Sequence, residues 1–134
     1  MNSKKITEAM SRICRGHNYL FGTGTVQRAL CDKSGEAAAW LLPPTLCMVD
    51  GRRHGRATYS LTLYLSRRRL RTDNTEAAST ADSLQDDALT IFSELSQEPF
   101  AALVAELRIK TRSCGLRPDA GVEIVVTADV ETIF

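Results

Sequence analysis

Residues 57–65, Ala-Thr-Tyr-Ser-Leu-Thr-Leu-Tyr-Leu, restrict the possible fold more than any other segment of this sequence. The odd-numbered positions are apolar and face one way, whereas Thr58, Ser60 and Thr62 face the other. A period of two, with β-branched and aromatic residues, is typical of a strand that buries one face. Asp50-Gly51, a strong hairpin signal, precedes this strand and follows a brief strand expected over residues 45–49. The sequence therefore predicts a sheet that is covered on one side.

Two amphipathic helices are available to cover that side. The first is expected over residues 3–15, with Ser3 as its cap and Gly16 as its stop. The second begins at or before Thr80, follows a polar linker over residues 72–80, and ends before Pro99. Apolar residues recur at helical spacing in both segments. They are Ile6, Met10, Ile13 and Cys14 in the first, and Ala81, Leu84, Ala88, Ile91, Phe92 and Leu95 in the second.

The remaining segments complete an α+β pattern. Further strands are expected over residues 25–31, 37–42, 108–114 and 122–130, with a glycine-containing loop before the first and a short helix over residues 100–107. Hairpins with helices segregated from them indicate an antiparallel sheet of about four to five strands packed against two main helices. With 134 residues, 43% hydrophobic and 25% charged, we expect one domain, residues 1–134.

Cysteine usage and hydropathy point to a soluble cytoplasmic protein without a membrane partner. Cys14, Cys31, Cys47 and Cys114 have no export signal before them, so we expect free thiols, mostly buried. The longest apolar run, residues 37–42, is far shorter than the about 20 residues that span a bilayer.

Charge is unevenly distributed along the chain. Residues 1–71 carry 13 Lys/Arg and 4 Asp/Glu, whereas residues 72–134 carry 4 Lys/Arg and 12 Asp/Glu, for a net charge of +1. Seven arginines fall within 20 residues, at the expected hairpin tip and after the strong strand. Arginine suits protein interfaces and phosphate groups alike. The candidate contact residues are Arg52, Arg53, Arg56, Arg67, Arg68, Arg69 and Arg71.

Reactive side chains do not gather in any recognisable motif. Cys14 and His17 are three residues apart, but no Cys-x-x-Cys pair accompanies them, as a structural zinc site would require. Gly22-Thr-Gly24 lacks the third glycine and the lysine of phosphate-binding loops. The simpler explanation of these glycines is that the loop needs unusual backbone angles. Neither His17 nor His54 has a nucleophile motif around it. We therefore expect no catalytic, cofactor-binding or metal-binding residues, no cofactor, and no enzymatic activity.

The order of elements resembles that of small tail-terminator and tail-completion proteins of long-tailed phages and prophages. The resemblance lies in the N-terminal helix before a Phe-x-x-Gly-like loop at residues 21–24, the apolar segment closed by Pro43-Pro44, the strand Tyr59–Leu65, the acidic helix Asp82–Leu95, and the C-terminal hairpin. It implies a non-enzymatic minor tail subunit that assembles into a homo-oligomeric ring, commonly a hexamer, in the tail or neck. Such rings dock on tail-tube or head-connector proteins, which would place the chain in the virion. The basic and acidic halves suit the heterologous contacts of a ring.

Two other functions remain open from the residues. One is a small nucleic-acid-binding module that uses the arginine-rich loops, although aromatic residues for base stacking are missing there. The other is a hydrolase or transferase, which would need His17 or His54 beside a carboxylate in a pocket.

Overall fold

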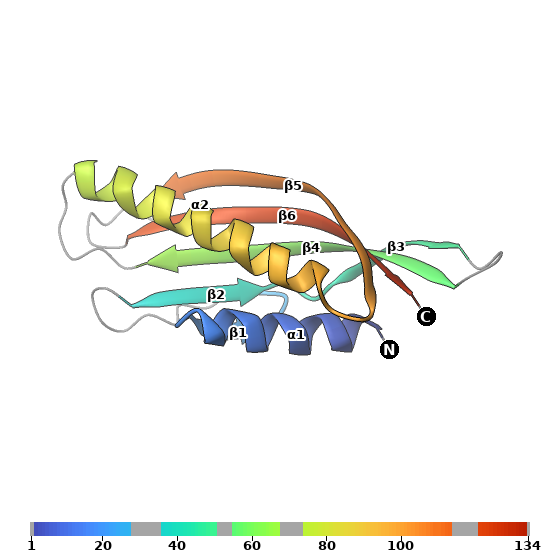
Figure 1. Ribbon diagram of the computed structural model, residues 1–134. Coiled ribbons are helices and arrows are strands. Elements are labelled where there is room, and N and C mark those ends of the chain that lie inside the picture. The colour runs from blue at the N-terminus through green and yellow to red at the C-terminus, as the bar shows by residue number, and fades with distance from the viewer. Residues whose placement is uncertain (1, 28–35, 51–54, 68–73, 114–120, 134) are drawn as a thin grey trace.

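The computed structural model describes residues 2–27, 36–50, 55–67, 74–113 and 121–133 (Figure 1). Within these residues it contains two helices and one six-stranded sheet. The elements in chain order are α1 (Asn2–Gly16), β1 (Leu20–Thr23), β2 (Ala37–Leu41), β3 (Thr45–Asp50), β4 (Arg56–Arg67), α2 (Asn74–Ser96), β5 (Ala101–Ser113) and β6 (Val122–Ile133). The predicted α+β class is confirmed, with more strands than the four to five expected.

Strand β4 is the centre of the sheet. The strand order is β1-β2-β4-β6-β5, and β3 pairs with the first residues of β4, 56–60, on the edge where β2 pairs with residues 63–67. All pairs are antiparallel except β1 with β2. β4 and β6 stay in unbroken register along their length, from Arg56 opposite Ile133 to Arg67 opposite Val122. β5 and β6 also pair with each other in antiparallel fashion, which confirms the predicted hairpin between the last two strands.

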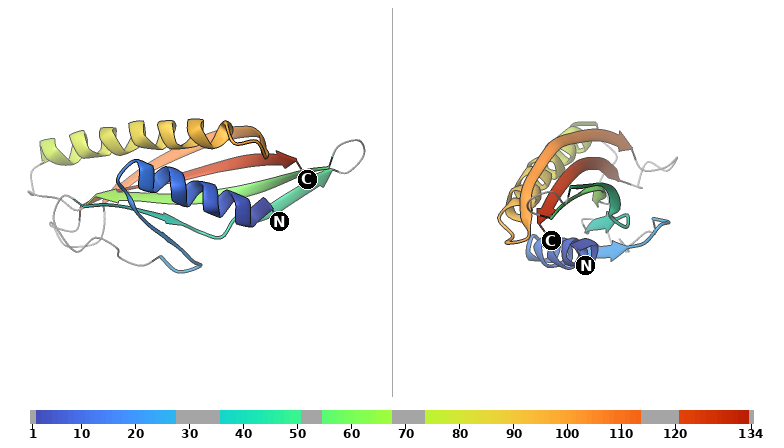
Figure 2. Two further views of the ribbon diagram at one scale, coloured as in Figure 1. Left: turned by 60° about the horizontal axis from the view of Figure 1, so that its bottom comes forward. Right: turned by 90° about the vertical axis from the view of Figure 1, so that its right-hand side faces the viewer.

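Both helices lie on one side of this sheet (Figures 1 and 2), where the apolar residues of β4 and β6 face them. Residues 57, 59, 61, 63 and 65 are buried, as the alternation predicts, and so is the whole predicted stripe of α2. One hydrophobic cluster joins α1, α2 and the sheet. The opposite side of β4 is half-buried and carries no described helix. The sheet therefore has one covered face and one open face. Neither described helix is long and apolar enough to cross a membrane.

The two ends of the described chain are tied together near the start of α1. The Asn2 side chain is buried and donates to Thr132 Oγ1 at 2.8 Å and to the Ile133 carbonyl at 3.2 Å. Helix α1 thus begins at Asn2 and not after Ser3. At its other end the left-handed residue is Asn18, with φ 65°, and not Gly16. The next residue, Tyr19, then donates its backbone N–H to the Cys14 carbonyl at 3.0 Å, which closes the helix end.

Three sequence-based assignments are wrong. The expected loop after α1 contains β1, and residues 25–27 of the expected strand 25–31 are not in a strand. The expected short helix over residues 100–107 is instead the first half of β5. α2 begins at Asn74, which agrees with the expected start at or before Thr80 and shortens the expected linker over residues 72–80. The unusual backbone angle expected in the glycine pair is found at Gly24, with φ 155°, where a Cβ atom would lie 3.2 Å from the Trp40 ring.

The described cysteines differ in burial, which predicts a difference in reactivity. Both are free thiols, as expected. Cys14 is fully buried in the core, as expected, whereas Cys47 is exposed on β3. Cys31 and Cys114 lie outside the described residues. Burial also raises the pKa of the Cys14 thiol to about 12, which removes the reactive thiolate at neutral pH.

In a Cys31→Ser, Cys114→Ser background, we expect Ellman's reagent at pH 8 to modify one thiol rapidly. Cys47→Ser should abolish this fast phase, and urea should then expose the Cys14 thiol. Rapid native-state modification of the Cys47→Ser protein would contradict the buried position of Cys14.

Candidate functional site

The seven candidate arginines are associated with the two ends of β4. Arg56 begins this strand and Arg67 ends it, while Arg52, Arg53, Arg68, Arg69 and Arg71 lie outside the described residues. A strand of this length separates its ends by roughly 35 Å. The structure therefore places Arg56 and Arg67 apart and does not bring them into one site.

The two described arginines have different surroundings. Arg56 Nη1 lies 2.7 Å from Glu131 Oε1 on the neighbouring strand β6, so its charge is neutralised within the subunit. Arg67 is half-buried, and its Nε is buried without a hydrogen-bond partner among the described residues. The guanidinium of Arg67 is also close enough to Tyr19 to lower the pKa of that phenol, against the larger effect of burial, which raises it.

Opposite charges from the two halves of the sequence meet between α1 and α2 inside one subunit. Arg12 of α1 pairs with Glu98, just after α2. The His17 Nε2 atom lies 3.1 Å from Glu94 Oε2, and Tyr19 donates its hydroxyl to Asp87 Oδ2 at 2.6 Å. These contacts line the junction of the two helices. One basic residue of the first half, Arg12, is therefore paired with an acidic residue of the second half within the subunit, and Glu94 and Asp87 of α2 are bound by polar side chains at the end of α1.

His17 and Glu94 form an imidazole–carboxylate pair of the kind a hydrolase needs, but its setting differs from that of an active site. Both side chains are partly exposed, at 27% and 45%. The surface has a hollow beside Tyr64, Arg108 and Lys110, and another between α1 and β1. Neither His17 nor Glu94 lines either of these two hollows. Among the described residues, no group of three His, Cys, Asp or Glu side chains is placed to hold a metal ion. The pair joins α1 to α2.

Strand β3 carries an apolar surface that the sequence analysis did not single out. All six of its residues are exposed, including Leu46 at 53%, Met48 at 66% and Val49 at 56%. Ile133, at 48% exposed, lies opposite Arg56 at the same end of the sheet. Figure 1 shows β3 and the start of β4 extending beyond both helices. We call β3 with residues 56–60 of β4 the β3 arm.

The exposure of the β3 arm follows from its position and not from its composition. Leu46 pairs with Tyr59 and Val49 with Ala57, so both lie on the side of the sheet that the helices cover elsewhere. β3 itself extends past both helices (Figure 2), so these side chains remain in contact with solvent although their partners Tyr59 and Ala57 are buried. Met48 pairs with Thr58 and lies on the other face, so both faces of β3 expose apolar side chains. Large exposed apolar side chains on a strand are a mark of a binding surface.

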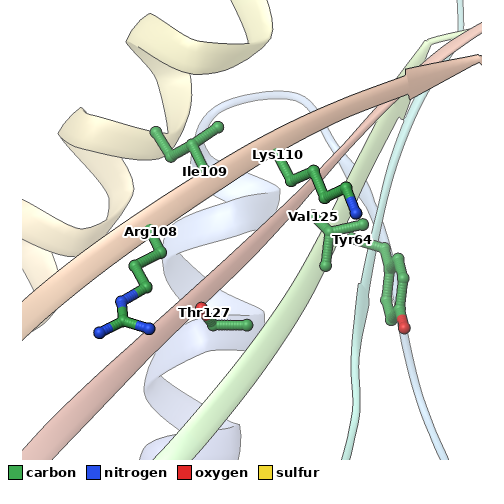
Figure 3. Close-up of a pocket in the computed structure, with 6 residues that line it drawn as sticks. All are labelled: Tyr64, Arg108, Ile109, Lys110, Val125 and Thr127. Carbon is green, nitrogen blue, oxygen red and sulfur yellow. The ribbon is translucent and has the colours of Figure 1, made fainter.

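The open face of the sheet holds a second surface, a hollow of about 360 Å³ (Figure 3). Tyr64 of β4, Val125 and Thr127 of β6, and Arg108 and Lys110 of β5 line it from the side away from the helices. Cross-strand pairing sets this arrangement, because Lys110 pairs with Val125 and Val125 with Tyr64. The hollow thus has an apolar floor and two basic side chains at its β5 edge.

Solved structures, but no family model or curated protein, resemble this chain. No protein-family model matches the chain, and no curated protein matches it in sequence. Among solved structures, a chain of the virion of a native gene transfer agent particle is similar in fold. The TM-score is 0.44 and the sequence identity 10%, over 93% of this chain and 84% of that chain.

Proposed function

We propose that this chain is a non-enzymatic structural subunit of a phage-like particle. It forms a homo-oligomeric ring in the tail or neck and docks on tail-tube or connector proteins. The observation that carries the proposal is the β3 arm, with its exposed apolar side chains beyond the packed body. Surfaces of this kind are typical of subunits that are covered after assembly. The structural neighbour belongs to a virion, which agrees with the proposal but at its TM-score does not support it independently.

The arginines at the two ends of β4 have a place in the same proposal. We assign Arg52 and Arg53 to contacts near the tip of the β3 arm, because they lie between β3 and β4 in the sequence, and Arg56 to the same region in its pair with Glu131. Arg67, Arg68, Arg69 and Arg71 follow at the opposite end of β4 and would contact a different neighbour. A subunit with two distant contact regions fits a particle in which each copy touches several partners.

The assembly state tests the proposal. We expect sedimentation velocity at physiological salt to show species larger than a monomer as the protein concentration is raised into the range of hundreds of micromolar. A protein that stays a strict monomer at the highest concentration would contradict the ring.

Substitution in the β3 arm tests its role in assembly. Met48→Glu with Val49→Glu should weaken association by about 2 kcal/mol or more, roughly thirtyfold, because a central apolar anchor would become charged. Val26→Glu is the matched control, since Val26 is 73% exposed and lies outside the β3 arm. It should associate like the wild type. If the Met48→Glu, Val49→Glu variant and Val26→Glu have equal effects, the β3 arm has no special role.

The alternative, a nucleic-acid-binding module, makes a different prediction for the same arginines. It requires binding to DNA or RNA with a steep salt dependence that is lost in Arg67→Ala, Arg68→Ala, Arg69→Ala. Under the assembly proposal this triple variant changes docking to protein partners, and nucleic acid binds weakly or not at all.

A further inference from the structure

Two oppositely charged surfaces remain after the ion pairs inside the subunit are accounted for. The first is the hollow on the open sheet face, with Arg108 and Lys110 at its edge. The nearest carboxylate to Arg108 is Glu106, at 3.9 Å, and the two side chains are 79% and 70% exposed, so that contact is weak. Lys110 is exposed and makes no ion pair with another described residue. Within the described residues, the lining of the hollow therefore carries two positive charges and no carboxylate, while Asp129 of β6 lies on the same sheet face, two residues from Thr127.

The second surface is the outer face of α2. Asp82, Asp86, Leu89 and Ser93 are exposed and recur at intervals of four, three and four residues. At about 100° per residue these positions fall within roughly 60° of one another around the helix. They lie opposite the buried stripe that packs on the sheet. Neither Asp82 nor Asp86 forms an ion pair with a described residue, and Leu89 is 54% exposed.

The two surfaces match in charge, spacing and apolar content. Asp82 and Asp86 are about 6 Å apart along the helix, and Arg108 and Lys110 about 7 Å apart along their strand. Each surface also has an apolar centre, Leu89 on α2 and the Tyr64–Val125 floor in the hollow. A helix laid on a sheet with these features would pair both carboxylates with both cations and cover Leu89.

We propose that the outer face of α2 in one copy of this chain packs on the open sheet face of the next copy. The inference deepens the proposed function and rests on it, because it names the contact that builds the ring. The helices and the open face lie on opposite sides of the sheet (Figure 2). A copy that uses its open face therefore still presents a free α2, and copies add head to tail, as a ring requires.

Charge reversal on each surface tests this contact. The sheet variant is Arg108→Glu with Lys110→Glu, and the helix variant is Asp82→Lys with Asp86→Lys. All four side chains are exposed, so both variants should fold, which circular dichroism checks. Each variant alone should lose at least about a hundredfold in association constant, measured by sedimentation velocity, because like charges then face one another.

Mixing the two variants gives the decisive result. An acidic α2 from the sheet variant then meets a basic sheet from the helix variant, and the reverse contact is also complementary. Association should return in the equimolar mixture, and also in one chain that carries all four substitutions. Lys4→Glu with Lys5→Glu, on the exposed face of α1, is the matched control and should associate like the wild type.

The possible failures are distinguishable. A wild-type protein that never associates overturns the ring and this contact together. A wild type that associates, with both charge variants associating equally well, overturns this contact and leaves the ring proposal standing. Loss of association in each variant without rescue in the mixture also overturns it, because the two surfaces then do not meet each other.

Discussion

Replacing Leu63 with Ala is expected to lower the free energy of unfolding by about 2–5 kcal/mol. Leu63 is fully buried in the central strand β4, on the face covered by the helices. It lies between Leu41 of β2 and Val126 of β6, which are its cross-strand partners and are also fully buried. Truncation leaves a cavity that these neighbours cannot fill, because the sheet holds their backbones in place. Urea unfolding followed by circular dichroism measures the loss.

Thr62→Ala is the matched control for Leu63→Ala. Thr62 precedes Leu63 on the same strand but is half-buried on the open face, beside Thr127. Its backbone carbonyl accepts from Leu42, an interaction that the substitution retains. We expect a loss below about 1 kcal/mol, mainly from the lower strand propensity of alanine. Similar losses at both positions would mean that the covered and open faces are assigned incorrectly.

Alkaline pH is expected to destabilise the fold steeply. Burial raises the pKa of the Cys14 thiol from its ordinary value of 9.0 to about 12. A raised pKa in the folded state means that stability is intact below pH 9 and is lost as pH rises toward 12, because the unfolded thiol ionises first. The loss from this group amounts to about 1.4 kcal/mol per pH unit, on the order of 4 kcal/mol by pH 12.

Tyr19 adds a loss of the same sign at higher pH. Burial and its hydrogen bond to Asp87 raise the pKa of the phenol above its ordinary value of 10.0. Stability contributed by the neutral phenol is therefore complete below pH 10 and falls above it. Cys14→Ala should flatten the dependence of the unfolding free energy on pH between 9 and 12, and Tyr19→Phe should flatten it above 10. Identical slopes in the wild type and both variants would contradict these shifts.

The elements predicted correctly are those whose periodicity is set by burial on one side. β4 and α2 are long, and their apolar residues are buried in the same core. The apolar positions in the sequence are therefore the positions that face the core. β1 is missed because it has four residues and pairs in parallel with β2. Its position depends on contacts with distant residues, such as the hydrogen bond from Thr23 Oγ1 to the Leu41 carbonyl at 2.7 Å.

The first half of β5 was mistaken for a helix for a related reason. The segment Ala-Ala-Leu-Val-Ala-Glu-Leu, residues 101–107, contains good helix formers. Pairing with β6 overrides that local preference. The register shifts between Ala105 and Arg108, where Glu106 takes a φ of 54°, and Arg108 and Lys110 then face the open side. A bulge of this kind leaves no clear mark in the sequence.

The candidate surfaces were predictable in part. The arginine clusters can be recognised in the sequence itself. The β3 arm and the hollow cannot, because they depend on which parts of the sheet the helices cover. Leu46 and Val49 would be assigned to the core by composition, and they are exposed because β3 extends past both helices. The uneven charge distribution is plain in the sequence, but the pairing of Arg12 with Glu98 and of Arg56 with Glu131 shows that part of it is neutralised within one subunit.

The continuity of β4 has a mechanical consequence. One strand runs from the β3 arm into the middle of the body, and it stays in register with β6 over its whole length. The hydrogen bonds of an antiparallel pair are perpendicular to the strands. A force applied to the β3 arm along β4 therefore acts in shear on the hydrogen bonds between β4 and β6. These bonds share the load and do not break one after another. A neighbour held through the arm would be anchored to the strongest part of the molecule.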